Sequence, residues 1–331
     1  MEGPSNSNRR FNLNDLYKKR ASIDESQANR RRKLLEHQKR NRRTAHDTSR
    51  PLLTQFEEED KTESKPKNQN AFSKQLMLSE WMEEIPANFE DDWLMVPCPV
   101  GMRVLLVAGR GRTKAYTKHG RYIFEFQSAL PGGRFKQFYK TAKNTILDCI
   151  YHKPTESFYI LDLIAWGNQS LTNCDRGFRY FWLQGKLSEG AKLLEKNSHL
   201  NMFPILPLSH YECSVEKISY VLNNWPLFGN NSPKVDGLLF YHKNALYTAG
   251  FTPTVLWLYP FMVPEIISRG VMVNDNYMRE KPVDYKNQRL FIEKFNQERK
   301  SCLKSMVIRT EDTVDSSAIS DLDQEMKLIS I

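Results

Sequence analysis

The segments VDGLLFYHK (residues 235–243) and TPTVLWLYP (residues 252–260) decide the fold of this chain of 331 residues. Both are rich in leucine, β-branched and aromatic residues, and only a short gap separates them. This composition favours β-strands, and a short connection joins strands that lie side by side in a sheet. We therefore predict that the two segments are neighbouring strands.

The same pattern recurs outward from these strands. Further strands are predicted at residues 93–98, 103–109, 114–118, 121–126, 145–151 and 158–166. Helices are predicted at residues 177–190, 214–223 and 285–300, with a short helix through SKQLMLSEWM at 73–82. Glycine-containing turns separate several strands at hairpin length. The chain is therefore predicted to be an α+β protein with mostly antiparallel sheets.

Nearly all of the net charge lies in the first fifty residues. They hold 14 Lys or Arg and 6 Asp or Glu, so they carry +8 of the total charge of +9. A basic arm of this kind is suited to an acidic partner. The remainder of the chain is nearly neutral, which argues against a broad RNA-binding surface on the folded part.

The composition divides the chain into four parts. Residues 1–45 form a basic arm with one helix at about 24–44. Residues 46–70 are a linker, marked by prolines and the acidic run EEED. Residues 71–300 are the folded domain, and residues 301–331 are a flexible tail with a net charge of −3.

Cysteine usage and hydropathy predict a soluble intracellular protein. The five cysteines include no CxxC pair, which argues against a zinc site or a disulfide framework and favours a reducing compartment. The N-terminus, MEGPSNSNRR, has no apolar signal region. No apolar run approaches the roughly 20 residues that a membrane span requires. No metal, no cofactor and no membrane contact are therefore expected.

The basic helix has an unusual distribution of charge. RRRKLLEHQKRNRR at 30–43 spreads its basic residues over more than one helical face, with Glu36 as its one acid. Solvated helices usually alternate their signs, so this helix fits a concave acidic protein surface and would fold on binding. It resembles the importin-β-binding segment of nuclear import adaptors. The matching residues are Arg30, Arg31, Arg32, Lys33, Lys39, Arg40, Arg42 and Arg43. A nuclear-localisation patch or a nonspecific nucleic-acid tail is the alternative.

The folded part resembles the nucleotidyltransferase domain of RNA-capping guanylyltransferases and DNA ligases. Those enzymes carry a lysine nucleophile in a Lys-x-Asp-Gly-x-Arg pattern, and the corresponding segment here is CPVGMR at 98–103. Cys98 stands at the lysine position and Val100 at the aspartate position. Leucines flank Trp257 where phosphate-binding lysines are expected. A thiol does not form the lysyl-nucleotide intermediate, so the resemblance implies a pocket that holds a nucleotide without reacting with it.

Taken together, the segments resemble one family of nuclear import adaptors for spliceosomal small nuclear ribonucleoproteins. The matching segments are RRRKLLEHQK, NQNAFSKQLMLSEWM, CPVGMRVLLVAGRG, AYTKHG, SALPGG, TILDCIY, VDGLLFYHK and TVLWLYPFMV. The resemblance implies a domain that binds the trimethylguanosine cap of U small nuclear RNAs, behind an importin-β-binding arm, with no catalysis. It also implies shuttling between cytoplasm and nucleus, with return through an exportin. The apolar residues near the N-terminus that would engage an exportin, Phe11, Leu13 and Leu16, stand among basic groups.

The resemblance also implies which residues hold the cap. Trp257 would stack on the methylated base, and Trp81 would flank the base or its methyl groups. Ser79 would form a hydrogen bond with the phosphate or ribose. Arg103 and Lys118 would face the triphosphate, because guanidinium and ammonium groups suit phosphate oxygens.

Two further residues are inferred from their apolar character alone. Leu238 and Leu256 would supply surface for the two exocyclic methyl groups. Several of the implied residues also have ordinary structural interpretations. Trp81 could pack on the body of the domain, Arg103 could pair with a carboxylate, and Lys118 could be solvated in a turn.

Two other functions are compatible with the same residues. A divergent nucleotidyltransferase could use Lys114 or Lys118 as its nucleophile. A general RNA-binding protein could contact phosphates through the basic arm. Labelling by GTP or ATP with Mg²⁺ would indicate the first, and loss of cap affinity on deleting residues 1–50 would indicate the second.

Overall fold

The computed structural model describes residues 25–41, 72–134, 143–189 and 201–297. The predictions for the linker, the acidic tail and the apolar residues near the N-terminus fall outside these ranges, as do those for Arg42 and Arg43.

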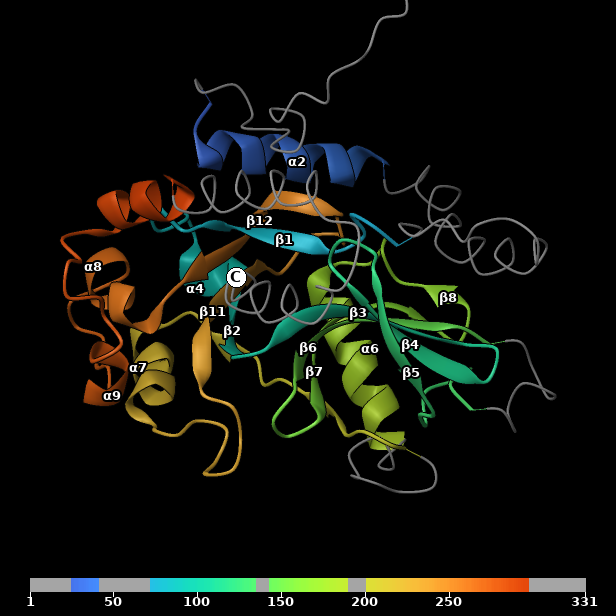
Figure 1. Ribbon diagram of the computed structural model, residues 1–331. Helices are drawn as coiled ribbons and strands as arrows, with labels where there is room; N and C mark the ends of the chain where they lie inside the picture. Colours follow the sequence, from blue (N-terminus) through green and yellow to red (C-terminus); the bar gives the residue numbers. More distant parts are fainter. Residues whose placement is uncertain (1–24, 42–71, 135–142, 190–200, 298–331) are drawn as a thin grey trace, which may run out of the picture.

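Two β-sheets form the body of the domain (Figure 1). In sheet A the strand order is β1-β12-β11-β2-β10; β1 is parallel to β12, and the other neighbours are antiparallel. Its strands are β1 (Met77–Trp81), β12 (Gly250–Leu258), β11 (Val235–His242), β2 (Trp93–Pro99) and β10 (Tyr211–Glu212). The segments VDGLLFYHK and TPTVLWLYP, which contain β11 and most of β12, are therefore neighbouring strands within this sheet, as predicted.

Sheet B is antiparallel along its main path, with the order β5-β4-β3-β6-β7-β8, and β9 pairs with β7 in parallel. Its strands are β3 (Met102–Gly109), β4 (Arg112–Thr117), β5 (Tyr122–Phe126), β6 (Thr145–His152), β7 (Ser157–Trp166), β8 (Gln169–Ser170) and β9 (Ile205–Pro207). All strands predicted from the sequence are present. The predicted α+β class with mostly antiparallel sheets is confirmed.

Three predicted helices are confirmed, and a fourth is seen in part. The basic helix predicted at about 24–44 is α2 (Gln27–Asn41). α6 (Arg176–Glu189) and α7 (Val215–Asn223) match the predicted ranges closely, and residues 288–297 are helical. Ser214 caps α7 by accepting a hydrogen bond from the backbone N–H of Lys217. The remaining short elements are α4 (Phe89–Asp92), η2 (Pro260–Met262), α8 (Val263–Ile266) and α9 (Asp275–Met278).

The helix predicted at residues 73–82 is wrong, because this segment contains strand β1. Strand β1 lies along the free edge of β12, with Ser79 opposite Thr252 and Trp81 opposite Trp257. Beyond the strand, the backbone N–H of Met82 still donates to the carbonyl oxygen of Trp257 at 3.1 Å. The segment has no strong local preference, so pairing with a distant strand decides its conformation.

Three apolar clusters build the layers of the domain. The central cluster joins side chains of sheet A, such as Leu239 and Trp257, to those of sheet B, such as Leu105 and Leu161. A second cluster fills the space between sheet B and α6. A third lies on the other face of sheet A, beneath α7 and α9. Trp257 therefore faces the interior between the two sheets.

The described ranges contain no helix that combines the length and apolar character needed to cross a bilayer. In these same residues, no group of three or more His, Cys, Asp or Glu side chains is arranged to hold a metal ion.

Candidate functional site

Trp257 borders a small cavity between the two sheets. Its side chain is almost fully buried, with 2 % of the residue exposed. The cavity has a volume of about 10 Å³, close to the space of a single water molecule. It is lined by Ser79, Cys98, Gly101, Arg103, Ile150, Asp236, Leu239 and Trp257. A purine is far larger than this space, so a base can stack on Trp257 only if the surrounding side chains move apart.

Two glycines shape this cavity. A Cβ atom at position 237 would lie 2.2 Å from the Trp257 ring, so the indole packs directly on the backbone of Gly237. A Cβ atom at position 101 would lie 2.6 Å from both the Ile150 side chain and the carbonyl oxygen of Tyr151. A larger residue at position 237 would displace the Trp257 indole, and one at position 101 would clash with strand β6.

The predicted roles of Leu238 and Leu256 are wrong. Both leucines are fully buried in the cluster on the opposite face of sheet A. Successive side chains of a strand point to opposite faces, so the neighbours of Trp257 and Leu239 cannot share their cavity. Leu239 is the leucine that lines it.

Trp81 and Trp257 occupy paired positions on adjacent strands. The Trp81 ring, however, packs against other aromatic rings. Its centroid lies 5.7 Å from that of Tyr259, 6.1 Å from that of Phe291 and 5.7 Å from that of Phe295. The two indoles that were predicted to enclose the base are thus near one another in the sheet, but only Trp257 lines the cavity.

Arg103 lines the cavity but is held by an internal ion pair. Its guanidinium group donates to both carboxylate oxygens of Asp148, at 2.9 and 2.8 Å, and to the carbonyl oxygen of Met77 at 2.6 Å. The Tyr247 hydroxyl donates to the same carboxylate at 2.9 Å, and the backbone N–H of Met77 donates to that hydroxyl at 3.1 Å. This matches the structural interpretation of Arg103. The network anchors the start of β1 and thereby positions Ser79, which also lines the cavity.

Lys118 lies in the turn between β4 and β5. It is absent from the lining of the cavity beside Trp257, as is Lys114. Lys118 as a phosphate ligand therefore stays a prediction. Lys118 could contact the triphosphate only if the triphosphate of a bound cap extended from the cavity towards this turn.

Cys98 is the residue that the sequence resemblance places at the lysine position of the nucleotidyltransferase pattern. Burial raises the pKa of its thiol well above the ordinary range. The thiol therefore stays protonated, and its sulfur lies 3.8 Å from the carbonyl oxygen of Pro99. A neutral, buried thiol is a weak nucleophile.

Asp236 is the charged lining residue that the sequence did not predict; Gly101, Ile150 and Leu239 are the other lining residues absent from the predicted site. It lies on β11 directly before Gly237. Burial, followed by the nearby Glu280, raises the pKa of its carboxyl to about 7. Among the described residues, its carboxylate has neither a hydrogen bond nor an ion pair. The Asp-Gly pair at the start of VDGLLFYHK is the signal that could have drawn attention to it.

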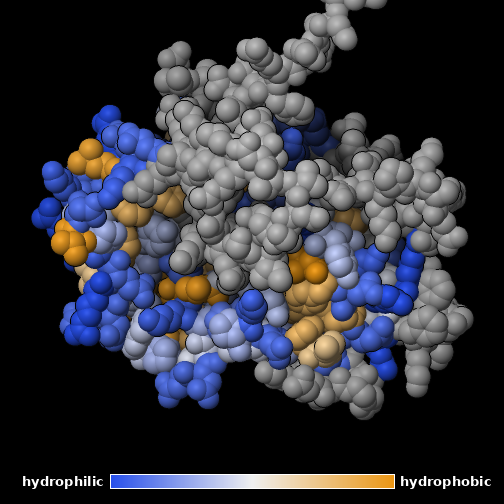
Figure 2. All heavy atoms as spheres, viewed as in Figure 1, coloured by the Kyte–Doolittle hydropathy of each residue, from blue (hydrophilic) through white to orange (hydrophobic). Residues whose placement is uncertain are grey.

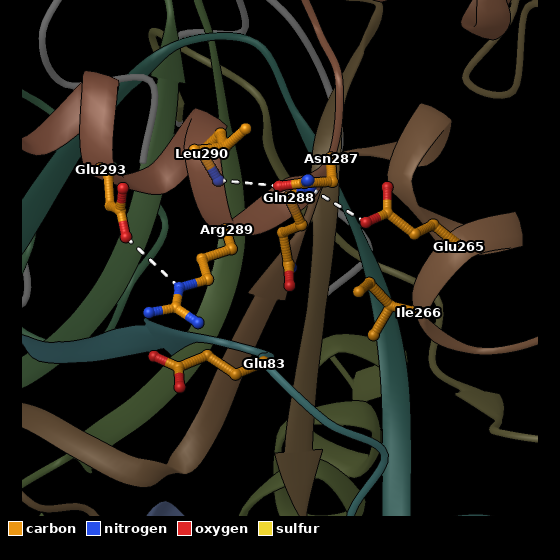
Figure 3. A pocket seen from close by; sticks show the side chains of 8 residues that line it. All are labelled: Glu83, Glu265, Ile266, Asn287, Gln288, Arg289, Leu290 and Glu293. Carbon is orange, nitrogen blue, oxygen red and sulfur yellow. Dashed lines mark hydrogen bonds and ion pairs between the residues drawn. The ribbon is translucent and has the colours of Figure 1, made fainter.

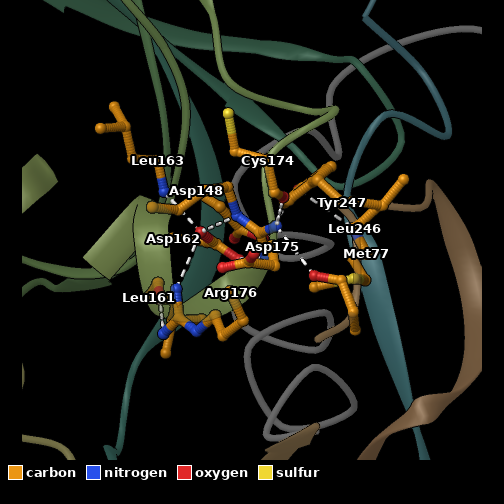
Figure 4. Close-up of polar contacts among 12 residues, drawn as sticks. Met77, Asp148, Leu161, Asp162, Leu163, Cys174, Asp175, Arg176, Leu246 and Tyr247 are labelled. Carbon is orange, nitrogen blue, oxygen red and sulfur yellow. Dashed lines mark hydrogen bonds and ion pairs between the residues drawn. The ribbon is translucent and has the colours of Figure 1, made fainter. Parts of the chain in front are cut away.

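A second buried polar network, around Asp162, adjoins the network of Asp148 and Tyr247 (Figure 4). Asp162 on β7 receives an ion pair from Arg176 at 2.8 Å and two hydrogen bonds from Arg179, at 2.9 and 2.8 Å. Burial opposes ionisation of Asp162, but the two guanidinium groups outweigh this effect and lower its pKa. The network fastens α6 to sheet B, so it is a structural feature, although the buried Arg176 Nε has no hydrogen-bond partner among the described residues.

A larger, open cavity of about 570 Å³ lies at the C-terminal helical segment (Figure 3). It is lined by Glu83, Glu265, Ile266, Asn287, Gln288, Arg289, Leu290 and Glu293. Its charged lining consists of three carboxylates and one guanidinium. This balance disfavours phosphate, and none of the predicted cap-binding residues lines it.

The basic helix of the arm, α2 (Gln27–Asn41), lies against the edge of sheet A (Figure 1). Arg30 donates to both oxygens of Glu80, at 2.5 and 2.9 Å. Gln27 donates to the same carboxylate at 2.9 Å and to the carbonyl oxygen of Trp81 at 3.0 Å. Glu80 lies on β1 between Ser79 and Trp81, so α2 is attached to the strand that carries two of the predicted cap-binding residues.

Arg31 is buried in the same interface. It donates to the carbonyl oxygen of Pro253 at 2.8 Å, and its guanidinium carbon lies 4.8 Å from the centroid of the Trp93 ring. Burial lowers the pKa of Arg31 to about 10. Further along the helix, Gln38 donates to the hydroxyl of Thr248 at 2.9 Å.

The predicted importin-β contacts therefore divide into two sets. Arg30 and Arg31 face the body of the domain. The exposed set is Arg32, Lys33, Lys39 and Arg40. One helix thus presents a bound face and a free basic face.

A protein-family model described as "Snurportin1, m3G cap-binding domain" matches residues 75–260. Several solved structures of DNA ligases are also similar. A mycobacterial DNA ligase D complexed with ATP and MES has 10 % sequence identity and a TM-score of 0.37, with 55 % of this chain and 58 % of that chain covered. A Lig E DNA ligase has 14 % identity and a TM-score of 0.35, with 55 % and 67 % covered. The chain thus spans less than two thirds of the length of the first of these ligases. Sequence identities and TM-scores this low do not indicate a shared activity.

Proposed function

Because this chain belongs to the Snurportin1 m3G cap-binding domain family, we propose that it is a nuclear import adaptor for RNA that carries the m3G (trimethylguanosine) cap. Its folded domain holds the cap of a U small nuclear ribonucleoprotein, and its basic arm holds importin-β. It performs no reaction on either partner. It moves between cytoplasm and nucleus, with return through an exportin.

The observation that carries this proposal is the position of the cavity. Every residue that lines it lies within the range matched by the family, residues 75–260. The cavity brings together an indole, apolar side chains and polar groups from both sheets. An aromatic ring beside convergent polar groups is the usual composition of a site for a planar ligand.

Base recognition requires an opening of this site. An N7-methylated guanine carries a positive charge, so it stacks on an indole by dispersion and by a cation–π interaction. Base–aromatic stacking contributes about 1–3 kcal/mol. Part of this free energy is spent in separating Trp257 from its neighbours. The ligand-free chain therefore represents a closed form of the site.

The arm supports the importin-β half of the proposal. Its exposed basic residues form a surface suited to an acidic partner, and electrostatic binding of this kind weakens as salt increases. Arg30 and Arg31, by contrast, are already engaged by Glu80 and the Pro253 carbonyl. A carrier that surrounds the whole helix can contact these two arginines only after α2 leaves the domain.

The state of Cys98 supports binding without catalysis. A nucleotidyltransferase needs an activated nucleophile at this position, whereas the thiol here is buried and protonated. Incubation with labelled GTP and Mg²⁺ should leave no covalent label on the chain. A label that survives acid precipitation would overturn this part of the proposal.

The cap-binding proposal is tested by titrating the chain with m3GpppG and m7GpppG while recording tryptophan fluorescence. We expect saturable quenching by both, with tighter binding of the m3G form because its two additional methyl groups bury more apolar surface. Deleting residues 1–50 should leave cap affinity intact and abolish importin-β binding. The absence of any response to m3GpppG would refute the proposal.

A further inference from the structure

We propose that Asp236 recognises the positive charge of the methylated base, by placing an ionised carboxylate beside the ring and accepting a hydrogen bond from its N1–H. This assignment rests on the proposed cap-binding function. It adds the group that selects a cationic purine within that site.

The strand register places Asp236 beside the stacking surface. Leu239 of β11 is paired with Trp257 of β12. The Trp257 ring packs on Gly237, which directly follows Asp236. Asp236 and Trp257 line the same cavity. A base that stacks on the indole therefore enters the enclosure that holds this carboxylate.

The charges around the cavity favour a cation. Arg103 and Asp236 are its two charged lining residues. The charge of Arg103 is offset by Asp148, which it contacts through both carboxylate oxygens. Asp236 has no such partner among the described residues. The cavity therefore suits a positively charged ring better than a phosphate group.

The protonation state of Asp236 responds to such a ligand. Its pKa is raised to about 7 by burial and by Glu280. The other titratable groups near it are Cys98 and Tyr259, whose own pKa values are raised by burial. Arg103 is also near, and its positive charge is paired with Asp148. A bound cation favours the ionised carboxylate. Cap binding below pH 7 is therefore expected to release a proton.

The chemistry of the trimethylated base matches one carboxylate. Methylation at N7 makes the ring cationic, and the two methyl groups on N2 leave no N–H there. N1–H is then the remaining donor on that edge of the base. A hydrogen bond from this N–H to an ionised carboxylate joins opposite charges, which makes it stronger than a neutral hydrogen bond. Asp236 thus reads the N7 methylation, while Leu239 and Ile150 offer apolar surface to the N2 methyl groups.

The test compares two ligands that differ in the N7 methyl group and in the positive charge that this group places on the ring: m3GpppG and its analogue that lacks the N7 methyl group. The wild-type chain should prefer m3GpppG. Asp236→Asn should lower affinity for m3GpppG by about tenfold to a hundredfold, the range of a lost charge-assisted hydrogen bond. It should lower affinity for the neutral analogue far less. Asp236→Glu keeps the charge and should retain the preference for the N7-methylated ligand.

Glu280→Gln is the matched control, because it removes a nearby carboxylate that does not line the cavity. We expect its affinity for m3GpppG to stay within about threefold of wild type, as is usual for a charge without direct contact. If wild type binds m3GpppG and Asp236→Asn binds it equally well, the assignment to Asp236 falls while the proposed function stands. If wild type binds neither ligand, the proposed function itself falls, and this assignment with it. Equal losses in Asp236→Asn and Glu280→Gln would indicate a general field effect and would also overturn the assignment.

Discussion

Two carboxylates of sheet A, Glu80 and Asp236, differ in their hydrogen-bond partners. Glu80 on β1 accepts three hydrogen bonds, all from the arm helix α2. Asp236 on β11 has no hydrogen-bond or ion-pair partner among the described residues, and it lines the cavity beside Trp257. Glu80, at the sheet edge, uses its hydrogen bonds to attach helix α2 of the same chain. The carboxylate beside Trp257 combines a raised pKa with the absence of a partner among the described residues, and this combination is typical of a binding site.

The largest expected effect on cap binding and stability is at the cavity that contains Asp236 and Trp257. Trp257→Ala removes the stacking surface and leaves a void in the central cluster. We expect loss of detectable cap binding and a decrease of about 3–5 kcal/mol in the free energy of unfolding. Fluorescence titration and chemical denaturation measure the two effects. Because the alanine variant loses stability, Trp257→Phe is the second variant, which should fold and bind the cap weakly.

Trp182→Phe in α6 is the matched control for that experiment. Like Trp257, Trp182 has a buried indole N–H without a hydrogen-bond partner in the described structure. It packs on the far side of sheet B. Its replacement should leave cap affinity unchanged, and a loss equal to that of Trp257→Phe would indicate a general weakening of the domain.

The next effect concerns the cost of the unpaired carboxylate in the absence of ligand. The pKa of Asp236 rises from an ordinary 3.8 to about 7 in the folded chain, so folding favours its protonated form. The associated stability is present below pH 4 and is lost as pH rises towards 7. Asp236→Asn cannot ionise, so at pH 8 it should be more stable than wild type by about 1–3 kcal/mol, which is less than the full shift because the side chain is only partly buried. At pH 4 the two should be equally stable by thermal denaturation. A variant that is less stable than wild type at pH 8 would contradict this account.

A smaller effect is expected at the paired carboxylate. Glu80→Gln removes the charge that holds Arg30 while leaving every arm residue in place. The side chains of the pair are partly exposed, 26 % for Arg30 and 18 % for Glu80, so the loss of docking free energy should be about 1 kcal/mol. Backbone amides of α2 should then exchange hydrogen faster, and importin-β should bind several-fold more tightly. Glu84→Gln, at an exposed position close by, should change neither measurement.

The smallest effect on stability is expected on the free face of α2. Arg32 contacts only Glu36 in the described structure, at 3.4 Å, and both side chains are largely exposed. Arg32→Ala should change the docking of α2 by less than about 0.5 kcal/mol. Its affinity for importin-β should nevertheless fall. An unchanged importin-β affinity would remove Arg32 from the proposed contact set.

Sequence patterns predicted the strands well because strand residues alternate or run apolar over short distances. They failed at residues 73–82, where β1 forms only through its pairing with β12. Such a contact joins segments more than 170 residues apart and leaves no local periodicity. The error at Leu238 and Leu256 had a different cause. Proximity to Trp257 in the sequence was treated as proximity in the site, although adjacent strand residues face opposite sides.

The predicted polar site residues show a similar limit. Arg103 was predicted to face the triphosphate, with pairing to a carboxylate as the alternative, but the identity of its partner, Asp148, depends on the register of β3 and β6. Asp236 went unnoticed because an aspartate before glycine at the start of a strand is also a common turn signal. The docking of α2 could not be predicted from the arm, since its partners, Glu80 and the Pro253 carbonyl, lie far along the chain.

The aromatic packing around Trp81 has a practical consequence for where the domain can be cut. The family match ends at residue 260, yet two of the rings that cover Trp81 come from Phe291 and Phe295. Gln288 also donates to the carbonyl oxygen of Met82 at 2.8 Å. A shortened protein ending at 260 would expose this indole to solvent and strip the outer face of sheet A. The folding unit therefore extends at least to Phe295, and truncations that remove Gln288, Phe291 and Phe295 should aggregate.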